Sequence, residues 1–180
     1  RHRSGIEQAY RKAISQAKSE VIIANAYFVP GRKLRKALVL AAKRGVKVQL
    51  LLQGKYEYFM QYYAARPVYG VLLAAGVEIH EYSASFLHAK VAVVDGQWAT
   101  VGSSNLDPLS LLLAREANVS VQHRPFAETL RSRLVFAMQH QGDRMDPAEY
   151  AERPFRQRCF EWTAYALMRM ALKLQGRKYL

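Results

Sequence analysis

Cysteine is nearly absent from the 180-residue sequence. The one thiol, Cys159, excludes a disulfide within the chain and a metal cluster built on cysteine. The sequence also lacks an uninterrupted apolar run of the roughly 20 residues that a membrane-spanning helix needs. It contains no internal repeat. Hydrophobic residues make up 51% and charged residues 23% of the chain, which is the composition of a globular domain with a sizeable core.

Acidic residues are scarce as well. The chain has 14 Asp+Glu against 27 Lys+Arg, a formal net charge of +13. A surplus of this size lies on the surface, where it attracts polyanions. Nucleic acid and an anionic membrane are the two candidate partners, and general solubility is the third interpretation. Charge alone does not choose between them.

Apolar runs alternate with helical patterns over the first 82 residues. The runs at 21–28, 46–53 and 77–82 predict buried strands. Helices are predicted at 4–17, where Ser4 and Glu7 form a capping box, at 32–44, and at 57–75. We expect Pro67 to break the third helix into two pieces. Strands that are separated by helices predict βαβ crossovers.

The pattern changes after residue 82. LHAKVAVV, the Asp95-Gly96 pair and QWATVG predict an antiparallel hairpin. A further strand is predicted at 116–122 and a helix at 125–140. The whole predicts an α/β fold, with a mixed, largely parallel sheet flanked by helices on both faces.

A basic tail follows Gly142, so we divide the chain into residues 1–142 and an amphipathic helical extension at 143–180. The most apolar part of the tail, residues 160–174, is short and contains Glu161, Arg169 and Lys173. It cannot span a bilayer. Two interpretations stay open: the tail lies on a membrane surface, or it packs back onto the domain.

Polar residues interrupt the predicted hairpin, FLHAKVAVVDGQWATVGSSN. On a strand, His88 and Lys90 face the same way with backbones about 7 Å apart. Asp95 lies on the opposite parity at the mouth of the turn, where it would hold the hairpin or cap nearby donors. Each of these residues alone is more often structural than functional.

The loop after the hairpin adds further polar groups. Ser103 and Asn105 place a hydroxyl and an amide near the strand ends, and Glu116 begins the next predicted strand. Imidazole, ammonium, hydroxyl, amide and carboxylate at adjoining strand ends suit an anionic oxygen cluster such as a phosphate.

These residues carry a resemblance to a known family. H-x-K-x-x-x-x-D at 88–95, followed by G-S-S-N with Ser103 eight residues beyond Asp95, resembles the phospholipase D superfamily signature. EVIIANAYFVPG, GVKVQLLLQG and the run SSNLDPLS followed by EANV resemble the C-terminal half of bacterial cardiolipin synthases. The resemblance makes residues 1–142 a catalytic half-domain. It implies four catalytic residues, which are His88, Lys90, Asp95 and Glu116. It also implies that Lys90, Ser103 and Asn105 bind the phosphate.

The resemblance also implies a mechanism without metal or cofactor. Imidazole attacks a phosphodiester phosphorus and forms a phosphohistidine, while a second histidine protonates the leaving alcohol and then deprotonates the incoming one. This sequence has one such motif, because His2, His80, His123 and His140 have no lysine two residues on. The second motif is expected either in a preceding part of a longer chain or on a second copy. The missing initiator methionine favours the first.

Three functional hypotheses follow. The leading one is a phosphatidyltransferase that forms cardiolipin from phosphatidylglycerol or a related donor, peripheral on the cytoplasmic side of the bacterial inner membrane. The second is a homodimeric nuclease of the same superfamily, with nucleic acid as its substrate. The third is a half-domain that binds acidic lipid without turnover.

Overall fold

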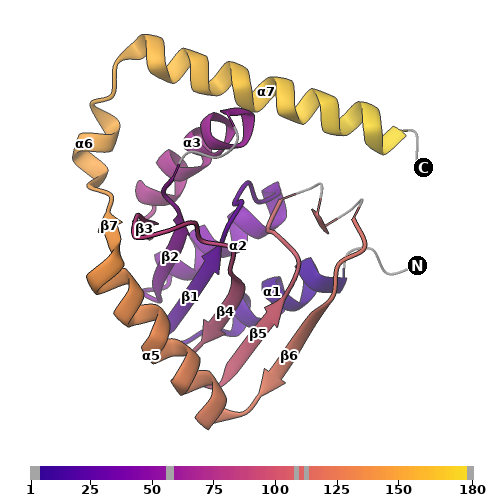
Figure 1. The fold of residues 1–180 in the computed structure, drawn as a ribbon, viewed down its shortest axis with the longest axis vertical. Coiled ribbons are helices and arrows are strands. Elements are labelled where there is room, and N and C mark those ends of the chain that lie inside the picture. Colours follow the sequence, from indigo (N-terminus) through magenta and orange to yellow (C-terminus); the bar gives the residue numbers. More distant parts are fainter. Residues whose placement is uncertain (1–4, 56–58, 108–109, 112–113, 178–180) are drawn as a thin grey trace.

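A seven-stranded mixed sheet forms the centre of the computed structural model, which describes residues 5–55, 59–107, 110–111 and 114–177 (Figure 1). The strand order is β6-β5-β4-β1-β2-β3-β7. The strands are β1 Glu20–Asn25, β2 Lys47–Gln53, β3 Glu78–Tyr82, β4 Lys90–Val94, β5 Trp98–Gly102, β6 Asn118–Gln122 and β7 Gly142–Arg144. The helices are α1 Gly5–Gln16, α2 Arg32–Lys43, α3 Phe59–Leu73, α5 Arg124–Gln141, α6 Pro147–Ala151 and α7 Phe155–Arg177.

The predicted α/β sheet with helices on both faces is confirmed. Its parallel part is confined to β1, β2 and β3, which the two crossover helices connect. The other four pairings in the described chain are antiparallel: β1–β4, β4–β5, β5–β6 and β3–β7. The sheet is therefore mixed rather than largely parallel, because hairpin-connected strands extend one side of the parallel core and β7 extends the other.

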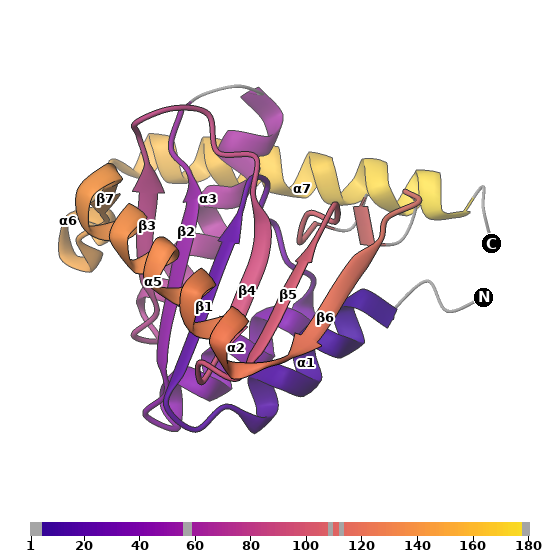
Figure 2. The same cartoon turned by 60° about the horizontal axis from the view of Figure 1, so that its bottom comes forward.

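Helices cover the two faces of the sheet unequally. Figure 2 shows α5 on one face and α1 and α2 on the other. Alternate strand residues divide between two cores: Ile23 and Leu50 pack with α1, α2 and α3, while Ile22 and Leu51 pack with α5. Burial on both faces explains why these strands are continuously apolar in the sequence.

The predicted hairpin forms around its Asp-Gly turn. Asp95 and Gly96 have φ of 51° and 62°, the two successive positive values that a type I′ turn requires. The strand before the turn is shorter than predicted, because β4 begins at Lys90 and leaves His88 in the segment that precedes it. Likewise β6 begins at Asn118, two residues after Glu116.

The predicted break at Pro67 is wrong. α3 continues through Pro67 from Phe59 to Leu73. An internal proline costs a helix about 3 kcal/mol, but α3 is buried on both sides of it, at Ala64 and Val68 among others. Packing against the sheet therefore outweighs the lost backbone hydrogen bond. The predicted start of this helix at Glu57 and the capping residue Ser4 lie outside the described residues.

The tail packs back onto the domain through α7. Glu161 is 1% exposed and Ala164 is also buried on the side that faces α3. Arg153 binds the Glu161 carboxylate through Nη1 at 2.7 and 2.8 Å, and its guanidinium lies 3.4 Å from the centre of the Tyr150 ring. The Tyr150 hydroxyl donates to the Arg66 carbonyl at 2.6 Å, which ties α6 to α3.

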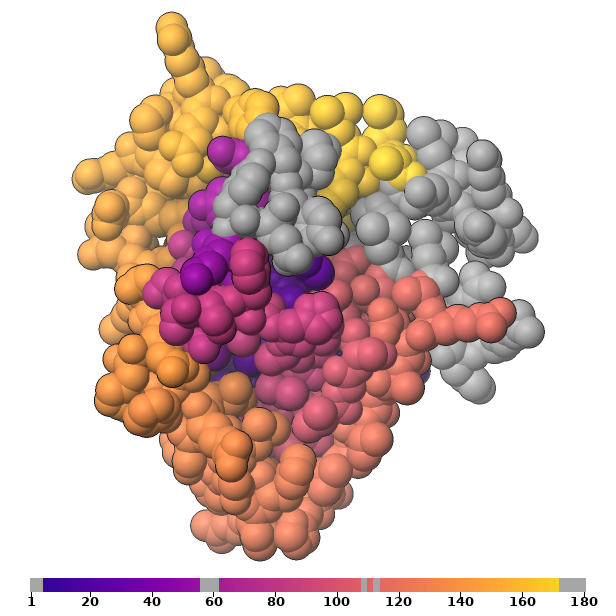
Figure 3. Space-filling model, viewed as in Figure 1, coloured from indigo at the N-terminus to yellow at the C-terminus, as the bar shows by residue number. Residues whose placement is uncertain are grey.

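The opposite side of α7 is apolar and exposed. Its large apolar side chains are Phe155 (78% exposed), Trp162, Leu167 and Met170, each at least 48% exposed. Phe160 is 45% exposed, but its ring packs edge-on against Tyr63 of α3 with ring centres 5.0 Å apart. In the space-filling view α7 runs exposed along the top of the molecule (Figure 3). The helix thus packs Ala164, Tyr165 and Met168 inward together with a buried ion pair, and it also leaves large apolar side chains exposed. No helix in the described part of the chain is long and apolar enough to cross a membrane.

Candidate functional site

Five of the six predicted site residues lie at one edge of the sheet. Because β4 and β6 run antiparallel to β1 and β5, the ends of β1 and β5 meet the starts of β4 and β6 there. Asn25 pairs with Lys90, and Gly102 pairs with Asn118. This edge carries His88, Lys90, Ser103, Asn105 and Glu116. In both ribbon views α7 lies at this same end of the molecule (Figures 1 and 2).

His88 and Lys90 differ in exposure. The His88 side chain is exposed, and Lys90 is 5% exposed. The Lys90 ammonium donates to the His88 carbonyl at 3.0 Å. A charged ammonium in a low-dielectric position attracts an anion far more strongly than one in water. The pair therefore offers an accessible imidazole beside a fixed positive charge.

Ser103 and Glu116 are joined across the β5–β6 pairing. The Ser103 hydroxyl donates to the Glu116 carboxylate and accepts from the Ala117 amide at 3.1 Å. The Ser104 amide next to it donates to Oδ1 of Asn118 at 3.3 Å. The loop that follows β5 is thus bound to the start of β6.

Asn105 lies against the end of β1. Its Oδ1 accepts from the Tyr27 amide at 3.4 Å, and the next residue, Leu106, pairs with Phe28 in an isolated bridge. The G-S-S-N loop therefore contacts both β6 and the end of β1, which brings residues 78 positions apart in the sequence to one edge.

The structure does not bring Asp95 to the other five. Lys90 and Asp95 stand at opposite ends of β4, about 17 Å apart at strand spacing. The Asp95 carboxylate accepts from the backbone amides of Lys18, Ser19 and Glu20 at 2.9 Å each, and from the Ser19 hydroxyl at 2.8 Å. It ties the hairpin turn to the junction of α1 and β1, which agrees with the holding role that the sequence offered.

These contacts set the pKa of Asp95. Burial raises the pKa of its carboxyl, but the hydrogen bonds from Glu20, Lys18 and Ser19 outweigh that effect and hold the pKa below its ordinary value. Because its pKa is lower in the folded state, the Asp95 carboxylate stabilises the fold fully at pH values above the unfolded-state pKa. This stability is lost as pH falls through the folded-state pKa.

Asp95→Asn is therefore expected to lower stability by about 2 kcal/mol at neutral pH, where the carboxylate accepts charge-assisted hydrogen bonds. The difference from wild type should shrink as pH falls from about 4, where the unfolded carboxyl titrates, through the lower folded-state pKa, below which both proteins lack that charge. Denaturant unfolding across pH measures it. Asp143→Asn, at an exposed carboxylate, is the control. A difference that does not depend on pH would contradict the assignment.

Two buried amides that the sequence analysis missed support this edge. Oδ1 of Asn25 accepts from the Leu106 amide at 3.1 Å, and Oε1 of Gln53 accepts from the Leu87 amide at 3.0 Å. They position the G-S-S-N loop and the residue before His88. Their position in the sequence could have predicted this role, because Asn25 is the polar residue that ends the apolar strand β1 and Gln53 is the polar residue that ends β2.

Gly102 is required by the close approach of β6. A Cβ there would lie 2.3 Å from Asn118 side-chain atoms and 2.5 Å from the Ala117 carbonyl oxygen. Gly102→Ala is expected to cost about 1–3 kcal/mol in overpacking and to displace Ser103 from Glu116. Thermal unfolding measures the loss. Gly5→Ala, where nothing lies within 4 Å, is the matched control and should be nearly neutral.

Solved structures share this fold. Nuc from Salmonella typhimurium, a phospholipase D family member, superposes with a TM-score of 0.66 at 23% identity, over 79% of this chain and 91% of its own. The phosphatidylserine synthase of Haemophilus influenzae gives 0.69 at 12% identity, over 97% of this chain and 43% of its own. At these identities the likeness establishes the fold, which is that of the phospholipase D family.

Sequence comparison identifies the family more closely. The family described as cardiolipin synthase, PLD-like domain, matches residues 10–135, and the chain belongs to it. Cardiolipin synthase B of Salmonella typhi is 52% identical over 133 residues, 74% of this chain. A cardiolipin synthase of Geobacillus thermodenitrificans is 36% identical over 156 residues, 87% of this chain. The chain spans about a third of the length of these relatives.

Proposed function

We propose that the chain is half of a phosphatidyltransferase that forms cardiolipin from phosphatidylglycerol or a related phospholipid. The observation that carries the proposal is its 52% identity to cardiolipin synthase B over a segment that includes the whole sheet edge from His88 to Glu116. The exposed imidazole and the buried ammonium at that edge support it.

The chemistry proceeds through a covalent intermediate. One histidine attacks the phosphatidylglycerol phosphorus and forms an N–P bond, while the P–O bond to glycerol breaks and the other histidine protonates the leaving glycerol oxygen. The hydroxyl of a second phosphatidylglycerol then loses its proton to that histidine and attacks the phosphorus, so that the N–P bond breaks and the first imidazole is released. The side chains that bind the phosphoryl oxygens are Lys90, Ser103 and Asn105. Glu116 orients the Ser103 hydroxyl, from which its carboxylate accepts a hydrogen bond.

The second histidine comes from outside this chain. We place it in the remainder of a longer parent protein, since the chain spans about a third of its relatives. A second copy related by a two-fold axis is the other arrangement, with His88 of each copy in one site. Either arrangement brings the second histidine to His88, at the edge of the sheet where β4 begins and β5 ends.

The partner surface is an anionic membrane, and we propose a peripheral location on the cytoplasmic side of the bacterial inner membrane. The net charge of +13 and the outward apolar side of α7 support it. Trp162 among apolar residues, with Arg158 and Arg169 close by along the helix, is typical of a helix that lies in a lipid interface. On this proposal, α7 packs on α3 with one side and contacts lipid with the other.

A homodimeric nuclease is the second candidate. The observation that favours it is the size of Nuc, 91% of which this chain covers. A lipid-binding half without turnover is the third.

One experiment sorts the three. The chain is incubated in chelator with phosphatidylglycerol vesicles and, separately, with plasmid DNA. Cardiolipin and free glycerol from the vesicles would support the transferase, and nicked plasmid would support the nuclease. If neither substrate changes, the chain is mixed with the remaining part of the parent protein. Transfer that appears only then identifies a half-site, and its continued absence would contradict the proposal.

A further inference from the structure

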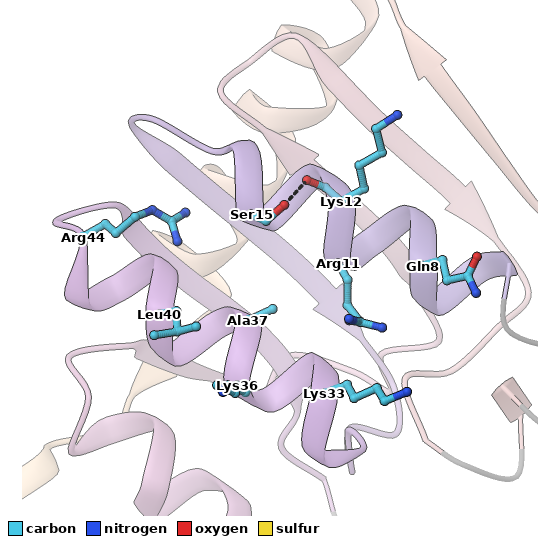
Figure 4. A pocket seen from close by; sticks show the side chains of 9 residues that line it. All are labelled: Gln8, Arg11, Lys12, Ser15, Lys33, Lys36, Ala37, Leu40 and Arg44. Atoms are coloured by element: carbon cyan, nitrogen blue, oxygen red, sulfur yellow. Dashed lines mark hydrogen bonds between the residues drawn. The ribbon is translucent and has the colours of Figure 1, made fainter.

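A groove of about 580 Å³ between α1 and α2 has five cations in its lining and no carboxylate from the part of the chain that the structure describes (Figure 4). It lies on the face of the sheet opposite α5. Its positive side chains come from both helices and from the residue after α2: Arg11, Lys12, Lys33, Lys36 and Arg44. This groove is the basic groove.

The charges of the basic groove are not neutralised within the described residues. Arg11, Lys12, Lys33 and Lys36 form no ion pair there, and Arg44 donates to the carbonyls of Ile14 and Ala17. Residues 5–45 hold nine of the 27 Lys+Arg and two of the 14 Asp+Glu. This segment therefore contributes a formal charge of +7, nine minus two, to the +13 of the chain.

The arrangement of the cations opposes the stability of α2. The first turn of this helix has no acidic residue, although its N-terminus favours negative charge. Lys33 and Lys36 are three residues apart, a spacing at which like charges repel. An external anion in the basic groove relieves both effects.

The residues between the cations indicate what kind of anion fits. Ala37 and Leu40 line the groove, and Leu40 is 45% exposed. Among the described residues no aromatic side chain lines it, so these residues offer no surface on which a nucleic acid base would stack. Cations around an exposed aliphatic side chain are instead typical of a surface that meets lipid headgroups and the first methylenes below them.

We propose that the basic groove binds the headgroups of anionic phospholipids, as a membrane contact separate from the catalytic edge and from α7. The inference rests on the proposed function only for the choice of phosphatidylglycerol as the headgroup. Because α2 begins shortly after the end of β1, the Lys33 end of the groove lies toward the catalytic edge and the Arg44 end lies away from it. Lipid held there is concentrated next to the site that would use it.

Vesicle binding tests the proposal without turnover, in the full chain carrying His88→Ala. The vesicles are phosphatidylcholine alone, or phosphatidylcholine and phosphatidylglycerol in equal parts. Lys33→Gln with Lys36→Gln is expected to weaken binding to the anionic vesicles about thirtyfold, roughly fivefold for each charge lost near the surface. Arg124→Gln with Arg133→Gln, at exposed positions on α5, removes the same charge from the opposite face and should leave binding within about threefold.

Other outcomes separate this proposal from its alternatives. Leu40→Ser should weaken vesicle binding and leave binding to duplex DNA unchanged. Equal losses from the α5 pair and the groove pair would overturn the proposal in favour of diffuse charge. A groove pair that weakens binding to DNA but not to vesicles would overturn it in favour of nucleic acid. A chain that binds anionic vesicles with no dependence on the groove contradicts this inference alone, and one that binds none contradicts the proposed function too.

Discussion

His88→Ala is expected to abolish phosphatidyl transfer, with a loss of at least about 10⁴-fold in turnover. Both chemical steps need imidazole, as the atom that bonds to phosphorus or as the group that moves the proton. His88 is the exposed histidine at the sheet edge, next to the Lys90 ammonium. The measurement is the amount of cardiolipin formed from labelled phosphatidylglycerol. The assay uses this chain together with the part of the parent protein that carries the second motif.

His140→Ala is the matched control for this substitution. The His140 imidazole is also exposed, but it stacks on Phe136 of α5 with ring centres 4.2 Å apart. Its loss should change turnover by no more than about twofold, as for an ordinary surface substitution. Normal turnover by His88→Ala would remove the sheet edge from consideration as the catalytic site.

Glu161→Ala is expected to destabilise the chain by about 3–5 kcal/mol, because it leaves the Arg153 guanidinium without its buried carboxylate. Glu161 is 1% exposed and also accepts from Gln157 at 3.0 Å. The loss falls on the contact between α7 and α3. Thermal unfolding followed by circular dichroism should show a melting temperature lower by roughly 10 °C.

Two further variants test whether the loss comes from the buried ion pair. Glu152→Ala removes an exposed carboxylate that forms no ion pair within the described residues, and it should cost less than about 0.5 kcal/mol. Arg153→Met with Glu161→Leu removes both charges together and should cost less than Glu161→Ala alone. If Glu161→Ala and Glu152→Ala prove equally stable, the pair is solvated and α7 is held by other contacts.

The sequence predicted most of the fold because its signals are local. Continuous apolar runs predicted β1, β2 and β3, and the Asp95-Gly96 pair predicted the hairpin through the positive φ that its turn requires. β7 could not be predicted, since Gly-Asp-Arg at 142–144 has no apolar pattern and becomes a strand only by pairing with β3. Pro67 misled for the same reason: burial of α3 is a tertiary effect.

The site was predictable to a similar extent. Parity and spacing along one hairpin put His88, Lys90 and Ser103 together. The same spacing placed Asp95 at the mouth of the turn, where the structure finds it. Its grouping with the other site residues came from the motif alone, which says nothing about position along a strand. Asn25 and Gln53 were missed because their role is to hold loops that are distant in the sequence.

The outward aromatic side of α7 has a practical consequence for handling the protein. In plain buffer, a row containing Phe155, Trp162 and Met170 will drive copies together to hide it from water, whatever happens at the catalytic edge. A dimer seen by light scattering under those conditions therefore does not report two histidines sharing one reaction centre. Subunits are better counted in detergent micelles that cover α7, where any pairing that persists comes from another surface.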